Sequence, residues 1–288
     1  MSQAADTRKR PEMTRSGLAP TQAVDAVDEY QNLREMEVAD EQPLTIYLDR
    51  YEVVTLMTLG TQPELLTLGY LKNQGLVKEI GDIKSIQVDW DVNASVVTTR
   101  SGDTTWLEKT KNRTITTGCG QGTVFGHIMD QLGEIRLKPN PIKQSDLYTL
   151  LKNLTEHNDV YKSAGAVHGC ALCRGTEILI FIEDVGRHNA VDAIAGHMWL
   201  EDIRGDDKLF YTTGRLTSEM VIKVAQMGVP ALLSRSGITQ MGLKLARDTG
   251  VMLFSRAKGN HFLIYNGREH VEFDVQLPPK LSVSHLKS

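Results

Sequence analysis

The feature that most constrains the fold is an alternation of short apolar runs and amphipathic segments between residues 168 and 267. The runs "EILIFIED", "KLFYTT", "VPALLS" and "VMLFS" have the length and composition of buried strands, and segments with helical spacing follow the first three. This alternation is typical of a largely parallel sheet with helices packed on it. The sequence therefore predicts an α/β fold for this part of the chain.

Small residues and a cation follow each of these apolar runs. The four endings are Gly186 with Arg187, Gly214 with Arg215, Arg235 with Ser236 and Gly237, and Arg256 with Lys258 and Gly259. In an open α/β sheet, the carboxyl ends of the strands form the ligand crevice, and helix N-termini there present N–H groups to anions. One such loop is ordinary, but four together favour a pocket for a phosphorylated or otherwise anionic small molecule.

The preceding residues follow a different order. The runs "LTIYLD" and "EVVTLMTL" predict a hairpin, a helix is predicted over residues 63–76, and further strands lead to Cys119. This order predicts a small α+β roll, and Pro139 and Pro141 mark a linker after it. The predicted division is a leader over residues 1–42, an N-terminal domain over 43–138, a C-terminal domain over 146–272 and a tail over 273–288.

The charge is unevenly distributed along the chain. Residues 1–42 hold five Lys or Arg and nine Asp or Glu, which leaves 27 of each sign in residues 43–288. We expect the first 42 residues to be a mostly disordered acidic leader with one short helix near residues 24–36. A neutral body gives no electrostatic reason to bind nucleic acid. The sequence has no membrane-length apolar run and no secretory signal, so a cytoplasmic protein is expected.

The three cysteines occupy two different settings. Cys119 lies in "GCGQG", where three glycines in five residues give an accessible, mobile thiol. Such a thiol suits a nucleophile that visits two partners in turn, although no Lys, Arg or His is adjacent in sequence to lower its pKa. The alternative is a tight turn with an incidental cysteine. Cys170 and Cys173 form a C-x-x-C within a predicted strand, where they point to opposite faces, so both are expected to pack in the core.

The segment "GRHNAVDAIAGHM" predicts a helix that starts directly after a strand. His188 and Asp192 are four residues apart, so they are expected to meet on one helix face, where the carboxylate would orient the imidazole. The pair is either a structural feature of the helix start or a contact to a ligand. The usual signatures of serine hydrolases, P-loop NTPases and zinc deaminases are absent from the sequence, and no metal site is predicted.

Five motifs together carry a family resemblance. They are "TTGCGQG", "VHGCALC", "EDVGRHNAVD", "TTGRLTSEMVIKVAQMGVPALLSRSG" and "GVMLFSRAKGNHFLIYNG". In this order they resemble the formate dehydrogenase accessory sulfurtransferases, the FdhD/NarQ family, from about residue 43 to 267. The resemblance implies a C-terminal three-layer α/β domain similar to the cytidine-deaminase-like fold, and a homodimer.

The resemblance also implies a function. Members of this family take sulfur from a cysteine desulfurase as a persulfide, and transfer it to the molybdenum of a bis(molybdopterin guanine dinucleotide) cofactor before that cofactor enters formate dehydrogenase. Cys119 matches the persulfide carrier. The family's cofactor-binding segment matches Phe254, Ser255, Arg256, Ala257, Lys258 and Gly259.

One position departs from the family pattern. Many members have a second cysteine three residues after the first, where this chain has Gly122. A second thiol could release sulfur by forming a disulfide, so its absence removes that route locally. Either an outside reductant or the metal centre completes the transfer, or Cys170 or Cys173 approaches in space. Two rival functions stay open: a cofactor chaperone without chemistry, and a phosphosugar- or nucleotide-binding enzyme.

Overall fold

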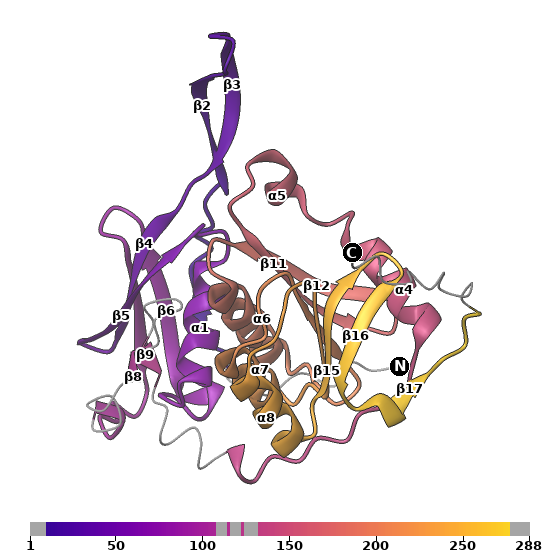
Figure 1. Ribbon diagram of the computed structural model, residues 1–288. Coiled ribbons are helices and arrows are strands. Elements are labelled where there is room, and N and C mark those ends of the chain that lie inside the picture. Colours follow the sequence, from indigo (N-terminus) through magenta and orange to yellow (C-terminus); the bar gives the residue numbers. More distant parts are fainter. Residues whose placement is uncertain (1–9, 108–113, 116–121, 124–131, 277–288) are drawn as a thin grey trace, which may run out of the picture.

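The computed structural model describes residues 10–107, 114–115, 122–123 and 132–276. Within these residues the chain forms two main sheets, with a layer of helices between them and a further helix outside the second sheet (Figure 1). No helix in the described ranges is long and apolar enough to cross a membrane.

The N-terminal sheet has five strands in the order β1-β6-β7-β4-β5. Its strands are β1 (Glu12–Met13), β4 (Gln42–Leu48), β5 (Tyr51–Thr58), β6 (Ile83–Asp89) and β7 (Ala94–Thr99). β4 and β5 pair in antiparallel fashion, which confirms the predicted hairpin. The predicted helix is also confirmed as α1 (Pro63–Asn73), which packs its leucines and Tyr70 against the apolar side chains of this sheet.

The second sheet has six strands in the order β12-β11-β13-β14-β15-β16. They are β11 (His168–Arg174), β12 (Glu177–Asp184), β13 (Leu209–Thr212), β14 (Ala231–Ser234), β15 (Met252–Lys258) and β16 (His261–Asn266). β13, β14 and β15 are parallel. β12 shares their direction, because β11 is antiparallel to both β12 and β13. Two of the five strand pairs are thus parallel and three are antiparallel, so the sheet is mixed, and the prediction of a largely parallel sheet is confirmed only for the adjacent strands β13, β14 and β15.

Helices cover both faces of this sheet. One face packs against α6 (Arg187–Glu201), α7 (Ser218–Gln226) and α8 (Gln240–Thr249), and the other against α4 (Gln144–Leu154). The short helix α5 (Asp159–Ser163) follows α4 in the chain and lies apart from it, beside the start of β11 (Figure 1). This part of the chain thus has three layers, and its likeness to the cytidine-deaminase-like fold stays a prediction.

α1 and α6 lie side by side between the two sheets (Figure 1). A Cβ at Gly69 would collide with the backbone carbonyl of Asp192, and one at Gly196 would collide with that of Leu65. Only glycine permits so close an approach of two helix backbones. One hydrophobic cluster therefore runs from the N-terminal sheet through α1 and α6 to the six-stranded sheet. The division into two domains stays a prediction.

The remaining elements are short. They are η1 (Ile80–Asp82), β8 (Thr114–Ile115), β9 (Gly122–Thr123), β10 (Ile142–Lys143), η2 (Arg268–His270) and β17 (Val271–Glu272). β8 pairs with β9, and β10 pairs with β17.

Part of the predicted disordered leader is instead a hairpin. β2 (Thr21–Val27) pairs with β3 (Leu33–Ala39) in antiparallel fashion over seven residues each, where the sequence predicted one short helix. The Asp28 carboxylate accepts hydrogen bonds from the backbone N–H groups of Tyr30 and Asn32, which fixes the turn. The hairpin projects from the body of the molecule beside β4 (Figure 1).

Candidate functional site

The four predicted strand ends lie along one edge of the six-stranded sheet, because β12, β13, β14 and β15 share one direction. β11 runs the opposite way, so it begins at this edge with His168. The strand ends are tied together by backbone hydrogen bonds. Arg235 N–H donates to the Thr212 carbonyl at 3.2 Å, and Arg256 N–H donates to the Ser236 carbonyl at 3.0 Å.

A pocket of about 360 Å³ opens at this edge. Its lining residues come from the segment around α5, the start of β11, and the turns after β13 and β14. They are Asn158, Tyr161, Val167, His168, Gly169, Thr213, Arg235 and Ser236. Two of the four predicted strand ends therefore contribute directly to one pocket. Burial raises the pKa of nearby Tyr211 to about 12, against the lowering effect of the Arg235 charge.

His168 provides a neutral imidazole in this pocket. Its Nδ1 lies 3.2 Å from Thr213 Oγ1, and Thr213 Oγ1 also accepts the backbone N–H of Gly169. Burial lowers the pKa of His168, and the positive charges of Arg187 and Arg215 lower it further. The pocket thus lies in a positive field while its histidine is uncharged at neutral pH, an environment that favours an anionic ligand.

The other two strand ends are placed differently. Arg187 is buried, and Gly214 leaves room for its side chain, because a Cβ at Gly214 would collide with it. In the predicted cofactor-binding segment, Arg256 and Lys258 are exposed. The side chains of Phe254, Ser255 and Ala257 are buried, and Phe254 packs edge-on against Phe262. Gly259 follows at the β15–β16 turn with a positive φ.

Two features of this segment are unusual for a strand end. Arg256 has φ +51, the left-handed region, which is strained for a side chain of this size. The Ser255 hydroxyl is buried and has no hydrogen-bond partner among the described residues. A strained cation next to an unsatisfied hydroxyl is typical of a binding segment more than of ordinary core packing.

The predicted pairing of His188 with Asp192 is wrong. Asp192 instead accepts hydrogen bonds from Lys223 Nζ and Asn73 Nδ2, both at 2.7 Å. His188 Nε2 lies 3.3 Å from Glu219 Oε2, but the contact lacks hydrogen-bond geometry, and within the described residues neither ring nitrogen has a hydrogen-bond partner. α6 is buried on nearly all sides, so Asp192 turns toward α1 and α7 and not toward its own helix neighbour.

His188 is held neutral by its surroundings. Its side chain is 1% exposed, and burial lowers its pKa to about 2, with smaller contributions from Lys223, Arg187 and His168. Beside it, the Asp184 carboxylate links the two sheets. It accepts hydrogen bonds from Thr58 Oγ1 at 2.5 Å and from the backbone N–H groups of Leu59 and Gly186. The motif "EDVGRHNAVD" thus forms a polar contact between the two halves of the molecule, and none of its residues lines the strand-end pocket.

The C-x-x-C pair is confirmed as core packing. Cys170 and Cys173 are both 0% exposed and belong to hydrophobic clusters on opposite faces of the sheet. Burial raises the pKa of each thiol to about 12. Neither is a reactive thiolate at neutral pH in this conformation. Cys119, the predicted nucleophile, lies outside the described residues, between β8 and β9 in the sequence.

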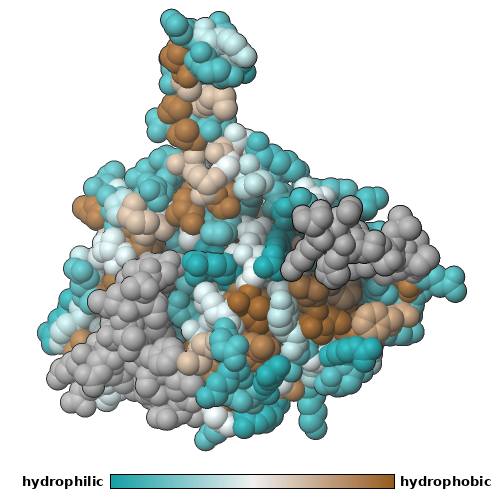
Figure 2. Space-filling view, viewed as in Figure 1, coloured by the Kyte–Doolittle hydropathy of each residue, from teal (hydrophilic) through white to brown (hydrophobic). Residues whose placement is uncertain are grey.

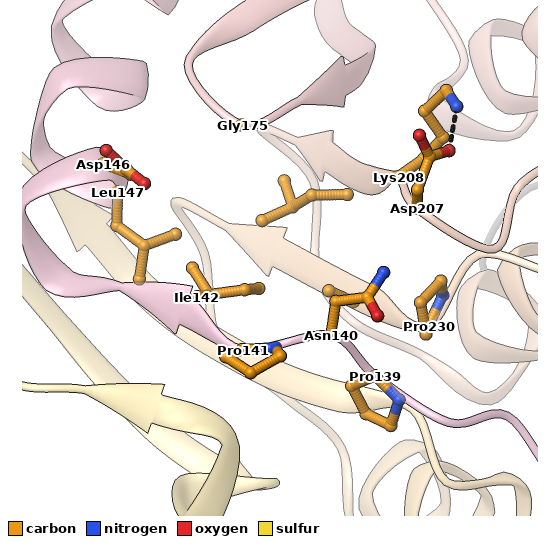
Figure 3. Close-up of a pocket in the computed structure, with 12 residues that line it drawn as sticks. Pro139, Asn140, Pro141, Ile142, Asp146, Leu147, Gly175, Asp207, Lys208 and Pro230 are labelled. Carbon is orange, nitrogen blue, oxygen red and sulfur yellow. Dashed lines mark hydrogen bonds and ion pairs between the residues drawn. The ribbon is translucent and has the colours of Figure 1, made fainter.

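A second, smaller pocket of about 100 Å³ lies at the opposite edge of the sheet, where β13 and β14 begin (Figure 3). Prolines 139, 141 and 230 and apolar side chains form most of its wall. Lys208 is paired with Asp207, which also forms an ion pair with Arg174 Nε at 3.0 Å. Since its one lining cation is already neutralised, this pocket is a poor anion site.

Sequence reasoning missed Asn158 and Tyr161. Both precede β11 by several residues in a short helical segment without sustained apolar periodicity, so no sequence signal placed them at the sheet edge. Their contribution follows from the connection between α4 and β11, which brings α5 over the strand ends.

The fold and the site define an α/β protein with a strand-end pocket that is lined by Arg235, His168 and several small polar side chains. A solved structure with a similar fold is a putative formate dehydrogenase accessory protein from Desulfotalea psychrophila, with a TM-score of 0.69 and 24% sequence identity. The matched part covers 88% of this chain and 98% of the solved chain.

The FdhD/NarQ family model matches residues 39–272, so the chain belongs to the FdhD/NarQ family. Its relatives include proteins named "Sulfur carrier protein FdhD". The one from Bacillus pumilus is 30% identical, covering 82% of this chain and 90% of the relative. The relative from Bacillus licheniformis is 28% identical over 83% of this chain and 92% of its own length.

Proposed function

We propose that this chain is a sulfur carrier that accepts a sulfur atom on Cys119 from a cysteine desulfurase and transfers it to a molybdenum cofactor destined for formate dehydrogenase. The observation that carries this proposal is the family match over residues 39–272, together with relatives named as sulfur carriers. The cargo would be the bis(molybdopterin guanine dinucleotide) cofactor, bound as a substrate.

The first chemical step is an exchange between sulfur atoms. The Cys119 thiolate attacks the outer sulfur of the desulfurase persulfide, a new S–S bond forms on Cys119, and the desulfurase cysteine leaves as a thiolate. The step involves no net oxidation. In the second step the outer sulfur goes to molybdenum as sulfide and Cys119 leaves as a thiolate. This step consumes two electrons, which come from the metal centre or from an outside thiol reductant.

The buried cysteines argue for a single-thiol mechanism. A resolving thiol must be accessible and partly ionised to attack a persulfide. Cys170 and Cys173 are fully buried with pKa values raised to about 12, so neither meets these requirements in this conformation. With Gly122 in place of the second loop cysteine, release would rely on the metal or on the external reductant.

The strand-end pocket supports the binding half of the proposal. Arg235, the Thr213 and Ser236 hydroxyls, and the positive field at His168 suit the phosphates of a guanine dinucleotide. The exposed side chains of Arg256 and Lys258 would extend the contact along β15. The protein would act in the cytoplasm as a homodimer, as the family resemblance implies.

Sulfur loading tests the chemistry. The wild-type chain and Cys119→Ala are incubated with a cysteine desulfurase and cysteine, and their intact masses are measured. We expect a gain of one sulfur atom in the wild type and none in Cys119→Ala. Absence of the gain in the wild type would leave a cofactor chaperone without chemistry as the better function.

Nucleotide binding tests the pocket. Arg235→Ala, Arg256→Ala and Lys258→Ala should each weaken binding of GDP, since a charge-assisted hydrogen bond is worth about 1.5–3 kcal/mol, or roughly 10- to 100-fold in affinity. The losses should shrink at high salt. Arg247→Ala, an exposed arginine near the end of α8, is the matched control. If sugar phosphates bind and GDP does not, a phosphosugar-binding enzyme becomes the better reading.

A further inference from the structure

The β2–β3 hairpin, residues 21–39, forms an arm that stands away from the rest of the molecule (Figures 1 and 2). The family match begins only at residue 39, so the arm precedes the matched region. At its base, β3 contacts α5, and Tyr161 of α5 lines the strand-end pocket. The arm therefore rises beside the pocket assigned to the cargo.

The tip of the arm is built as a fixed turn. Asp28 Oδ1 accepts the backbone N–H groups of Tyr30 and Asn32, each at 2.9 Å, and Asp28 Oδ2 accepts Arg34 Nε at 2.8 Å. Gln31 takes the left-handed conformation at φ 66. A turn with this many internal bonds presents its side chains in one arrangement, which lowers the entropy cost of binding a partner.

That turn presents apolar side chains to solvent. Tyr30 is 76% exposed, and Leu33 and Val27, which are opposite each other in the strand register, are 70% and 66% exposed. Met36 and Val38 are also exposed farther down β3. An isolated two-stranded hairpin gains little stability in water. Preordered aromatic side chains in such a position are typical of the anchor residues of protein interfaces.

The charge on the arm indicates the chemistry of the partner. Residues 21–39 contain five acidic side chains and one basic side chain, Arg34, whereas residues 43–288 are neutral. Asp25 lies directly opposite Glu35 across the two strands. Two such arms brought together would place like charges side by side, which is destabilising. The complementary surface is one with Lys and Arg around an apolar depression.

We propose that this arm is the docking site for the formate dehydrogenase that receives the cargo, with the Tyr30 tip seated in an apolar depression of that enzyme that is rimmed by basic residues. The inference rests on the proposed function, because a receiving enzyme must approach the strand-end pocket and the arm stands beside it. It assigns the acceptor contact to a segment that precedes the family match.

The test measures binding of the full chain to formate dehydrogenase purified from the same organism. Tyr30→Ser with Leu33→Ser should weaken binding about 10-fold or more. Glu35→Lys with Glu37→Lys should also weaken it, and should reduce its dependence on salt. Glu177→Lys, an exposed acid at the opposite edge of the six-stranded sheet, is the charge control and should bind like the wild type.

Three results would overturn the docking proposal. The first is a wild-type chain that does not bind formate dehydrogenase, and the second is unchanged affinity in both arm variants. The third is a shift of the arm variants from a larger assembly to a monomer in sedimentation velocity, which would assign the arm to a second copy of this chain. Sulfur loading on Cys119 and GDP binding do not involve the arm, so their failure would refute the proposed function and leave the docking result standing.

Discussion

Replacing His188 should remove much of the acid sensitivity of the fold. The imidazole is 1% exposed, and its pKa is lowered to about 2 in the folded state from an ordinary value of 6.5. The unfolded chain therefore binds a proton below about pH 6.5 that the folded chain does not. The free energy of unfolding must fall as the pH falls through this window, with the sign set by the lowered pKa.

The size of the effect follows from the two pKa values. Each pH unit below the ordinary pKa of 6.5 lowers the free energy of unfolding by about 1.4 kcal/mol. At about pH 4.5, two units below that value, His188 alone therefore destabilises the fold by about 2.7 kcal/mol. His168, whose pKa is also lowered, adds to the slope of the wild-type chain with the same sign. The His188→Gln variant has no titrating group at this position. Its free energy of unfolding should therefore fall less than that of the wild type between about pH 7.5 and 4.5, by roughly 2.7 kcal/mol.

The assay is urea unfolding of wild type and variant at both pH values, followed by circular dichroism. His261→Gln, an exposed histidine at the start of β16, is the control and should keep the wild-type pH dependence. Equal losses in wild type and His188→Gln would refute the reasoning. If the variant does not fold, the imidazole resonances of wild-type His188 serve instead: they should not titrate before the chain unfolds.

The remaining predictions concern stability and thiol chemistry. Gly69→Ala should lower the free energy of unfolding by about 3 kcal/mol, because its Cβ would strike the α6 backbone, whereas Gly81→Ala, which meets nothing within 4 Å, should not; urea unfolding compares them. Lys223→Met should cost about 3–5 kcal/mol in the same assay, because it leaves Asp192 buried without its cation; an unchanged midpoint would contradict this. In native protein, Cys170 and Cys173 should resist iodoacetamide and become labelled only in denaturant, as peptide mass spectrometry would record; native labelling would show that burial does not protect them.

The sequence predicted the inner strands of the six-stranded sheet well, because β11, β13, β14 and most of β15 are buried on both faces. Continuous apolar runs of strand length identify such strands, and the parallel order follows from the intervening helices. Cys170 and Cys173 were correctly predicted to point to opposite faces of the sheet, because side chains alternate between the two faces of a strand and these residues are three apart. The common edge of the four strand ends was equally predictable, because parallel strands end on the same side.

Other parts could not be predicted, for identifiable reasons. The arm has few buried side chains, so its strands carry no core-facing period, and pairing with each other holds them together. The partners of Asp192 are Lys223 and Asn73, 31 and 119 residues away in sequence, which helix spacing cannot reveal. The strand-end cations share an edge, but Arg187 is the first residue of α6 and packs its side chain against Gly214, whereas Arg235 lies in the turn after β14 and lines the pocket.

The contact between Gly69 of α1 and Gly196 of α6 restricts how the molecule can open. With the two helix backbones touching, the sheets on either side cannot rotate about the segment around Pro139 and Pro141 without first separating one shared core. Hydrogen exchange should therefore find the amides of α1 and α6 opening together, at the same free energy. If the cargo is the dinucleotide of the proposed function, it would then enter by displacement of the turns at the strand ends and not by hinge motion between the two sheets.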